Sequence, residues 1–238
     1  MTAGKNRACW IIVICFCIFA ISGCRVLSPN FEALYLDVLD AHESTQIHPP
    51  VIIIPGLLGS RLVDTKTGKE VWPGSLFDVA LGRYRDLVLD FDNQYPQHQS
   101  LVSAGIAESK LGVDFYGELL SVLVDYAGYE RVLLGAGPPR SGQRRLYVFD
   151  YDWRQDNVHT VKKLHEFIRA IRTDYANPEL KVDVIAHSMG GLMARYYLRF
   201  GDKDVLQDND LKVTWAGAEA INKMILLGAP NLGSVSAM

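Results

Sequence analysis

Short apolar runs alternate with longer amphipathic stretches along most of the chain. Runs rich in aliphatic residues predict strands at residues 51–54, 146–149, 182–186 and 221–227. The first of them, Val-Ile-Ile-Ile, has no polar position, which is typical of a strand buried on both faces of a parallel sheet. The apolar runs therefore predict a buried sheet.

Stretches with helical spacing of apolar residues lie between these strands. One helix is predicted from residue 113, with Phe115, Leu119, Leu120 and Leu123 on one side, and another at 190–200. The clearest amphipathic helix lies between these two, and its apolar face comprises Val158, Val161, Leu164, Ile168 and Ile171. Because strands that alternate with helices form βαβ units, the predicted fold class is α/β, with a mostly parallel sheet flanked by helices.

The first 24 residues differ in character from the rest. Lys5 and Arg7 precede an apolar run at 8–21, and small residues follow it, which is the pattern of a secretion signal. The run is shorter than the roughly 20 apolar residues that a membrane-spanning helix needs. Ile21–Cys24 (Ile-Ser-Gly-Cys) resembles the bacterial lipoprotein box, which implies cleavage before Cys24 and lipid attachment to that residue. An uncleaved signal anchor and an ordinary secretion signal are the alternatives.

These features predict a domain organisation in three parts. Residues 1–23 are predicted to form a lipoprotein signal, residues 24–49 a tether, and residues 50–238 an α/β core that lacks its C-terminal strands. The other three cysteines lie within the signal, so lipid on Cys24 would anchor a chain without disulfides on the exported side of a bacterial membrane. Residues 60–112 hold turn signals but little periodicity, and they are predicted to form a cap or lid insertion. The alternative is that the apolar residues of this insertion pack onto the core.

Composition and charge exclude few classes of protein. Of the 238 residues, 49% are hydrophobic and 21% are charged, as in ordinary globular proteins. The net charge of -3 gives no electrostatic basis for binding nucleic acid. No motif indicates a metal ion or an organic cofactor. The prediction of function therefore depends on local motifs.

The strongest chemical motif is Ala186–Gly190 (Ala-His-Ser-Met-Gly), which lies between a predicted strand and a predicted helix. It matches the Gly-x-Ser-x-Gly nucleophile elbow, with alanine in the first position, where the tight turn requires small residues. The elbow predicts Ser188 as a nucleophile beside a helix N-terminus, which favours developing negative charge. A serine that only caps the helix is the alternative. His187 is interpreted as structural, because adjacent side chains diverge on a sharp turn.

A second motif, Pro-Gly-Leu-Leu-Gly-Ser at 55–60, follows the predicted strand at 51–54. In α/β-hydrolase folds a loop at this place supplies one backbone N–H of the oxyanion hole, and the residue after the nucleophile supplies the other. These residues are Leu57 and Met189, and the glycines of the loop allow a close approach of its backbone. For the loop taken alone, an ordinary turn at a strand end is the alternative.

Several segments together resemble one known family. They are PVIIIPGLLGSRL at 50–62, VWP at 71–73, YDWR at 151–154, AHSMGG at 186–191 and LLGAPNLGS at 226–234. These segments look like the lecithin:cholesterol acyltransferase family, which has lysosomal phospholipase and phospholipid:diacylglycerol acyltransferase relatives. The resemblance implies an α/β-hydrolase fold and a serine enzyme. Such an enzyme moves an acyl group from a lipid ester, a phospholipid or acylglycerol, to an alcohol or to water.

The resemblance carries over two groups of residues. The catalytic group holds the nucleophile and the two oxyanion donors, which are Ser188, Leu57 and Met189. The substrate-binding group comprises Asp152, Trp153 and Arg154. A structural ion pair is the alternative for Asp152 and Arg154. The resemblance also implies that part of residues 60–110 forms a lid that contacts the membrane.

The general base and acid of a serine enzyme have no evident candidate in the sequence. An α/β-hydrolase triad runs Ser, then Asp or Glu, then His along the chain. All six histidines lie before Ser188, and the acidic residues after it precede the predicted strand at 221–227. We therefore expect the chain to be part of a longer protein or a truncated reading frame, and to be nearly inactive alone. The rival functions are a lipase or esterase with water as acceptor, and a non-catalytic envelope module that binds lipid.

Overall fold

The computed structural model describes residues 30, 47–74, 87–89, 100–110, 113–208 and 211–234. The chain divides into two compact units, Met1–Leu34 and Tyr35–Met238, and all described residues except Asn30 belong to the second. The predicted signal, the lipidation site Cys24 and most of the predicted tether lie outside the described residues. Among the described helices, none has the length and apolar character that crossing a bilayer requires.

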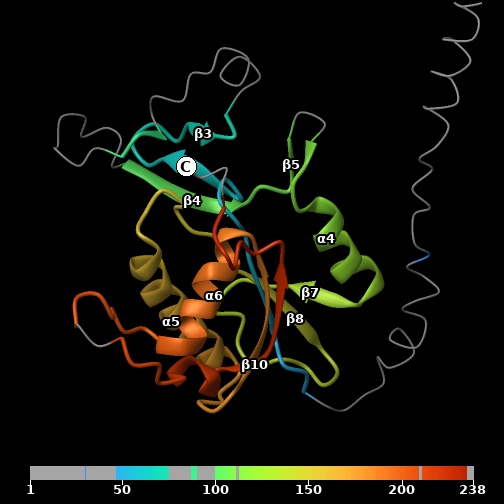
Figure 1. The fold of residues 1–238 in the computed structure, drawn as a ribbon. Helices are drawn as coiled ribbons and strands as arrows, with labels where there is room; N and C mark the ends of the chain where they lie inside the picture. Colours follow the sequence, from blue (N-terminus) through green and yellow to red (C-terminus); the bar gives the residue numbers. More distant parts are fainter. Residues whose placement is uncertain are drawn as a thin grey trace, which may run out of the picture. The chain divides into compact units, whose positions relative to one another are not determined.

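Five parallel strands form the main sheet in the order β10–β9–β1–β8–β7 (Figure 1). The strands are β1 (Val51–Ile54), β7 (Tyr129–Arg131), β8 (Arg144–Val148), β9 (Val182–His187) and β10 (Ile221–Leu227). The parallel sheet confirms the predicted α/β class. It also puts β1 in the middle, so the segment that follows β1 emerges at the centre of the sheet.

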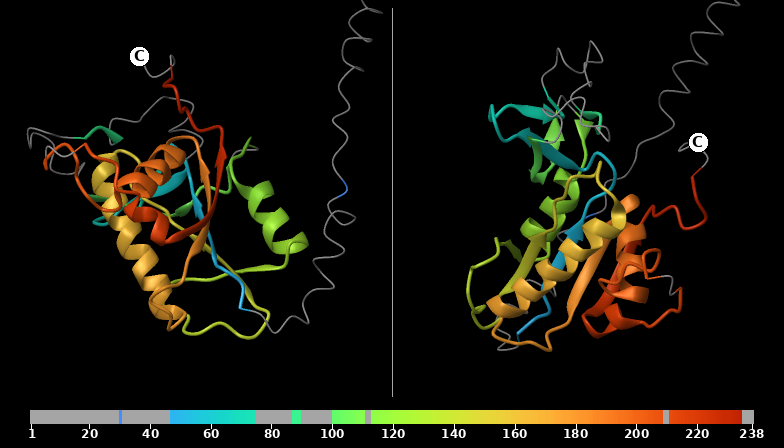
Figure 2. Two further views of the ribbon diagram at one scale, coloured as in Figure 1. Left: turned by 60° about the horizontal axis from the view of Figure 1, so that its bottom comes forward. Right: turned by 90° about the vertical axis from the view of Figure 1, so that its left-hand side faces the viewer.

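Helices cover both faces of the main sheet (Figure 2). The two long helices, α5 (Asn157–Asp174) and α6 (Met189–Phe200), lie on one face. The short helix α4 (Gly117–Ser121), continued by the π-helical turn η4 (Val122–Tyr126), lies on the other face. A 3-10 turn, η5 (Ala216–Glu219), precedes β10. The sheet is therefore the middle of three layers.

The side chains of β1 alternate between two cores. Ile52 and Ile54 belong to the large core under α5 and α6, whereas Val51 and Ile53 pack in a smaller core with Leu120 of α4. Successive side chains of a strand point to opposite faces, so a strand that is apolar throughout fits a sheet covered on both sides. All four residues are at most 4% exposed.

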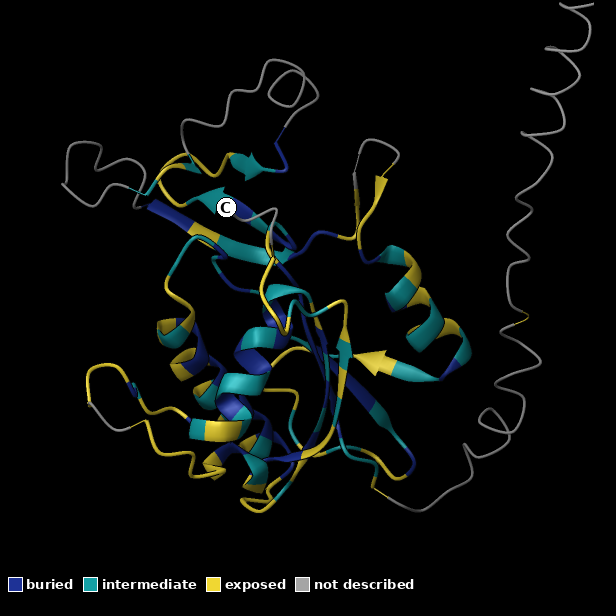
Figure 3. Cartoon of the chain, in the orientation of Figure 1, coloured by how far each residue is buried: buried dark blue, intermediate teal, exposed yellow. Residues whose placement is uncertain are grey.

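Helix α5 begins and packs as its sequence predicts. The Asp156 carboxylate accepts hydrogen bonds from the amides of Val158 (2.8 Å) and His159 (3.0 Å), so it caps the first turn. Four of the five residues of the predicted apolar face are buried against the sheet, and the fifth, in the first turn, is half-buried (Figure 3). The face anchors the helix that crosses between β8 and β9.

The helix predicted from residue 113 begins later, so that prediction was wrong at its start. Val113–Asp114 forms strand β6, which pairs with β5 (Ser109–Lys110), and Phe115 is exposed. The amides of Phe115, Tyr116 and Gly117 all donate to the carbonyl oxygen of Glu108. Because these bonds close a hairpin onto Glu108, helical geometry starts only at Gly117.

Part of the predicted insertion at 60–112 forms a three-stranded antiparallel sheet in the order β3–β2–β4. The strands are β2 (Ser60–Asp64), β3 (Glu70–Trp72) and β4 (Leu101–Ile106). Leu62 and Leu101 are buried in the large core of the main sheet, so at least these residues pack onto the core. A lid role for the insertion stays a prediction.

The packing of α5 can be tested with one buried and one exposed residue. Leu164→Ala should lower the free energy of unfolding by about 2–5 kcal/mol, because the residue is 2% exposed and its removal leaves a cavity. Lys163→Ala, one position along and exposed, should change it by no more than about 0.5 kcal/mol. Urea unfolding followed by circular dichroism measures both. Equal effects of the two substitutions would contradict the described packing.

Candidate active site

Ser188 lies on a strained turn between β9 and α6. Its backbone angles are φ 50° and ψ -119°, a region that residues with side chains rarely adopt. Its amide donates to the Leu227 carbonyl at 2.9 Å, so the end of β10 supports the turn. The residue is half-buried, and its hydroxyl makes no hydrogen bond within the described part of the chain. The turn thus has the form of the predicted nucleophile elbow.

Glycines let two loops close on this elbow. A Cβ on Gly190 would lie 2.5 Å from the Pro55 carbonyl oxygen, and one on Gly191 would lie 2.5 Å from Ala229 Cβ. On the side of the loop at 55–60, a Cβ on Gly56 would lie 2.8 Å from Ser188 Cβ. No real side chain fits at such distances. The elbow is therefore held between the loop after β1 and the loop after β10.

The loop after β1 makes a tight turn beside Ser188. The Gly59 amide donates to the Gly56 carbonyl at 3.0 Å, and Leu58 has φ 64°. A hydrogen bond from residue four to residue one, with positive φ at the third residue alone, defines a type II turn. In the trans peptide between Gly56 and Leu57, the N–H points opposite to the C=O. The Leu57 N–H is therefore directed away from the interior of the turn.

The two predicted oxyanion donors are both backbone amides at this place. Met189 is the first residue of α6, where N–H groups have no partner within the helix. Within the described residues, neither the Leu57 nor the Met189 amide donates a hydrogen bond to the protein. Two such donors near a serine hydroxyl could stabilise an oxyanion. Their role in catalysis stays a prediction.

Four aromatic side chains bind the backbone of the loop at 55–60. Tyr151 Oη donates to the Pro55 carbonyl (2.8 Å), and Tyr116 Oη accepts from the Gly56 amide (2.8 Å). Trp72 Nε1 donates to the Leu58 carbonyl (2.8 Å), and Trp153 Nε1 donates to the Ser60 carbonyl (3.0 Å). The Trp72 and Trp153 rings also meet edge to face, 5.8 Å apart. The loop is held along its whole length. These four aromatic residues (Tyr151, Tyr116, Trp72 and Trp153) are called the aromatic brace below.

The predicted substrate-binding residues have their polar groups engaged within the protein. Trp153 is buried as part of the aromatic brace. Arg154 Nε and Nη2 donate to the two Asp152 oxygens at 2.8 and 2.7 Å, and both side chains are less than 10% exposed. Burial opposes ionisation of Asp152, but the hydrogen bonds and charge of Arg154 outweigh it and lower the pKa of this carboxyl. The pair has the form of a structural ion pair, and substrate binding by these residues stays a prediction.

The ring nitrogen Nδ1 of His187 is paired with Tyr116 and not with the Ser188 hydroxyl. That nitrogen lies 2.7 Å from the hydroxyl of Tyr116, and burial lowers the pKa of the imidazole. The His187 ring therefore makes a contact of the structural kind expected from the sequence, with a partner that sequence reasoning had not identified.

Three residues of the site were missed by sequence reasoning. Trp72 and Tyr151 lie within the quoted motifs VWP and YDWR, so they could have been found by asking which motif residues carry a hydrogen-bonding ring. Tyr116 lies outside every quoted motif, 60 residues from Gly56 and 71 from His187. No local pattern indicates a contact of that range.

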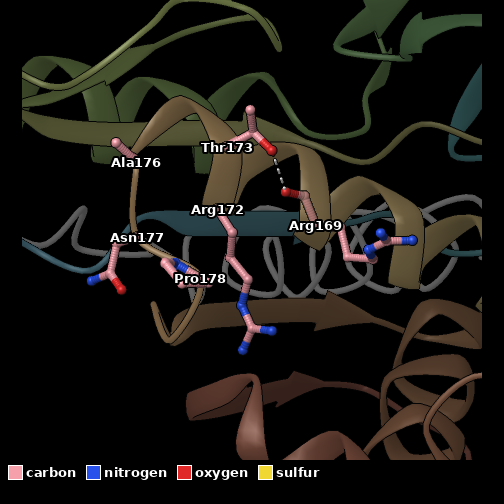
Figure 4. Close-up of a pocket in the computed structure, with 6 residues that line it drawn as sticks. All are labelled: Arg169, Arg172, Thr173, Ala176, Asn177 and Pro178. Carbon is pink, nitrogen blue, oxygen red and sulfur yellow. Dashed lines mark hydrogen bonds between the residues drawn. The ribbon is translucent and has the colours of Figure 1, made fainter.

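A separate pocket of about 390 Å³ lies at the end of α5 (Figure 4). Its lining includes Arg172, whose guanidinium donates to the carbonyls of Leu180 and Glu219. Leu180 and Glu219 precede β9 and β10, whereas Ser188 follows β9, so the pocket lies at the opposite edge of the sheet. Ligands of open α/β sheets bind at the carboxyl ends of the strands, where Ser188 is.

The fold and the elbow define the class. A parallel sheet flanked by helices, with a strained serine turn after β9 and a glycine-bearing loop after the central strand, is an α/β-hydrolase fold. Residues 141–238 match the sequence model of the lecithin:cholesterol acyltransferase family. The chain is also 27% identical over 196 residues to lecithin-cholesterol acyltransferase-like 4 of Arabidopsis thaliana. Together these two findings confirm the resemblance to this family that the motifs predicted.

The chain spans only part of the proteins that it matches. The alignment with the Arabidopsis protein covers 71% of this chain but 34% of that relative, so the chain spans about a third of its length. Among solved structures, the Tle4–Tli4 complex aligns with 17% identity and a TM-score of 0.30, over 62% of this chain and 42% of that chain.

The buried ion pair beside the site can be tested by removing one partner. Arg154→Met should lower the free energy of unfolding at pH 7 by about 3–5 kcal/mol, because it leaves the Asp152 carboxylate buried without its cation. Arg169→Met removes an exposed ion pair with Glu166 and should change the free energy of unfolding by less than about 1 kcal/mol.

The effect of Arg154→Met on stability should also depend on pH. Since the folded-state pKa of Asp152 is lowered, its contribution to stability is complete above the unfolded pKa of about 4 and is lost as the pH falls through the folded pKa. In Arg154→Met the Asp152 carboxyl loses its cation. Acidification should therefore narrow the difference in free energy of unfolding between the variant and the wild type. Urea unfolding from pH 7 to pH 3 measures this, and a gap that widens on acidification would contradict it.

Proposed function

We propose that the protein is a lipid-active serine O-acyltransferase or lipase that carries an acyl group on Ser188. The single observation that supports this most strongly is the strained Ser188 turn, which lies against the loop at 55–60 in a chain that resembles an acyltransferase family. The lipoprotein-like start of the sequence supports a place at a bacterial envelope membrane, where lipid esters are at hand.

The proposed chemistry has two steps. Ser188 Oγ attacks the carbonyl carbon of a lipid ester, and the amides of Leu57 and Met189 donate to the oxyanion that forms. The tetrahedral intermediate expels the leaving alcohol, which takes up the proton lost by the serine, and an acyl-enzyme remains. An acceptor hydroxyl then attacks the acyl-enzyme and restores the serine. Both steps require a general base, and no described residue is hydrogen-bonded to Ser188 Oγ in that role.

The acceptor distinguishes two candidate activities. An alcohol acceptor makes the protein a transferase, and water makes it a lipase or esterase. The family resemblance favours the first. Measuring the alcohol-ester product against free fatty acid, with a phospholipid or acylglycerol donor, separates the two. Lipid binding without turnover would instead support a non-catalytic envelope module.

The nucleophile is tested by substitution in the protein expressed from its native gene. Ser188→Ala should lower the turnover of a lipid ester by at least about 10³-fold and abolish labelling by a fluorophosphonate probe. Ser121→Ala, at an exposed serine of α4, should leave both unchanged. If Ser188→Ala kept its turnover, the proposed function would be wrong.

The oxyanion donor of the loop is tested by deleting one amide hydrogen. Leu57 is the second residue of a type II turn, where proline is favoured, so Leu57→Pro removes the N–H with little change in the turn. We expect kcat to fall by roughly 10²- to 10³-fold. Leu57→Ala retains the amide and should keep kcat within about threefold of the wild-type value. Similar kcat values for the two variants would rule out Leu57 as a donor.

A further inference from the structure

We propose that Tyr116 is a positioning residue of the active site, whose hydroxyl links the Gly56 amide to His187 and so fixes the direction of the Leu57 amide. The proposal rests on the proposed function in that it gives the Leu57 amide its role. The Tyr116 hydroxyl is hydrogen-bonded to Gly56 and His187 and not to Ser188, so it would act only through the loop.

The contacts of the Tyr116 side chain bring three parts of the chain together. Its oxygen lies 2.8 Å from the Gly56 nitrogen and 2.7 Å from His187 Nδ1, and the Tyr116 and His187 rings meet edge to face. Tyr116 is 5% exposed, and Gly56 is buried. One hydroxyl therefore joins the loop after β1 to the residue next to the elbow serine.

The direction of the hydrogen bonds follows from their donors. The Gly56 amide can only donate, so the tyrosine oxygen accepts from it and the hydroxyl proton is left for His187 Nδ1. That assignment places the proton of a neutral imidazole on Nε2. Burial raises the pKa of Tyr116 and lowers the pKa of His187, and both effects favour the neutral forms that this arrangement needs.

The backbone on either side of Tyr116 holds the hydroxyl in place. The Tyr116 amide donates to the Glu108 carbonyl at 3.0 Å, and the Ala107 amide donates to the Gly59 carbonyl at 2.9 Å. Ala107 thus binds the last residue of the turn, Gly59, and the Tyr116 hydroxyl binds its first residue, Gly56. Both ends of the turn are tied to one hairpin.

The tie at Gly56 controls the neighbouring amide. Gly56 has no side chain to limit its backbone rotation, so its position depends on bonds to its N–H and its C=O. Tyr116 binds the N–H, and Gly59 binds the C=O. Rotation of the Gly56–Leu57 peptide would turn the Leu57 N–H, and the two bonds oppose that rotation. Loss of the hydroxyl would leave a buried N–H without a partner and free the peptide.

The first test combines hydrogen exchange with kinetics. In Tyr116→Phe, exchange of the Gly56 amide measured by NMR should speed up by roughly 10-fold or more, because its acceptor is lost. The kcat for a lipid ester should fall on the order of 10-fold while KM stays within about twofold, because the oxyanion donor and not the ground-state site is misplaced. Tyr196→Phe, which removes a hydroxyl bonded to the Lys203 carbonyl away from the site, should change neither quantity.

The second test uses His187, whose ring nitrogen Nδ1 is the second partner of the Tyr116 hydroxyl. His187→Ala should lower kcat in the same direction as Tyr116→Phe, and adding it to Tyr116→Phe should lower kcat no further. His187→Asn should restore most of the kcat, since its amide oxygen can accept the tyrosine proton in place of Nδ1. Additive losses, or no rescue by asparagine, would overturn the link through His187.

The outcomes separate this proposal from the proposed function. If Ser188→Ala keeps full turnover, the serine mechanism is wrong. Hydrogen exchange of the Gly56 amide in Tyr116→Phe then still shows whether the Tyr116 hydroxyl holds the loop. If turnover depends on Ser188 but Tyr116→Phe has wild-type kcat and Gly56 exchange, the positioning role fails and the serine mechanism stands.

Discussion

Hydrogen bonds from the aromatic brace to the backbone at 55–60 are the interaction on which the rest of the site depends. A strand-end loop with two glycines has little of its own to hold it, because glycine loses more conformational freedom on folding than other residues. Each bond of the brace contributes about 0.5–1.5 kcal/mol net, and the three bonds made by Tyr116, Tyr151 and Trp153 would leave a buried polar group unsatisfied if broken. The bonds also determine which N–H and C=O groups of the loop remain without a partner, because groups bonded to the brace are not available to a ligand.

This division between occupied and free groups explains the composition of the neighbouring motifs. Tyrosine and tryptophan have large apolar rings that fill a core and a single polar atom that can reach a backbone group. The brace uses both properties: Tyr151 and Trp153 are buried in the large core, and each sends one hydrogen bond to the loop. The intervening Asp152 faces the Arg154 guanidinium instead. A motif that looks like a binding sequence therefore acts, in the folded chain, on the loop beside the serine.

Sequence reasoning reached four of the five strands of the main sheet, the elbow and the loop because each of these is encoded locally, whereas the edge strand β7 was missed. The strand at Val51–Ile54 was predicted to the residue, since a short run without polar positions lies between prolines at positions 50 and 55. The start of α4 was not reached, because three amides that converge on the Glu108 carbonyl compete with helical geometry. Tyr116 was missed for a related reason. Its position depends on that hairpin, and its partners lie 60 and 71 residues away.

The backbone conformation of Ser188 completes the physical account of the site. A residue with a side chain at φ 50° and ψ -119° costs on the order of 1–3 kcal/mol, and it persists only where its surroundings hold it. Here the surroundings are two loops and a strand edge, with Gly190 and Gly191 as the points of closest approach. Because the loop after β1 is bonded to the aromatic brace and the Ser188 amide is bonded to the end of β10, relaxing the turn would require breaking several of these contacts at once. These bonds suit a site that must hold a hydroxyl and two amides in fixed relation before any substrate arrives.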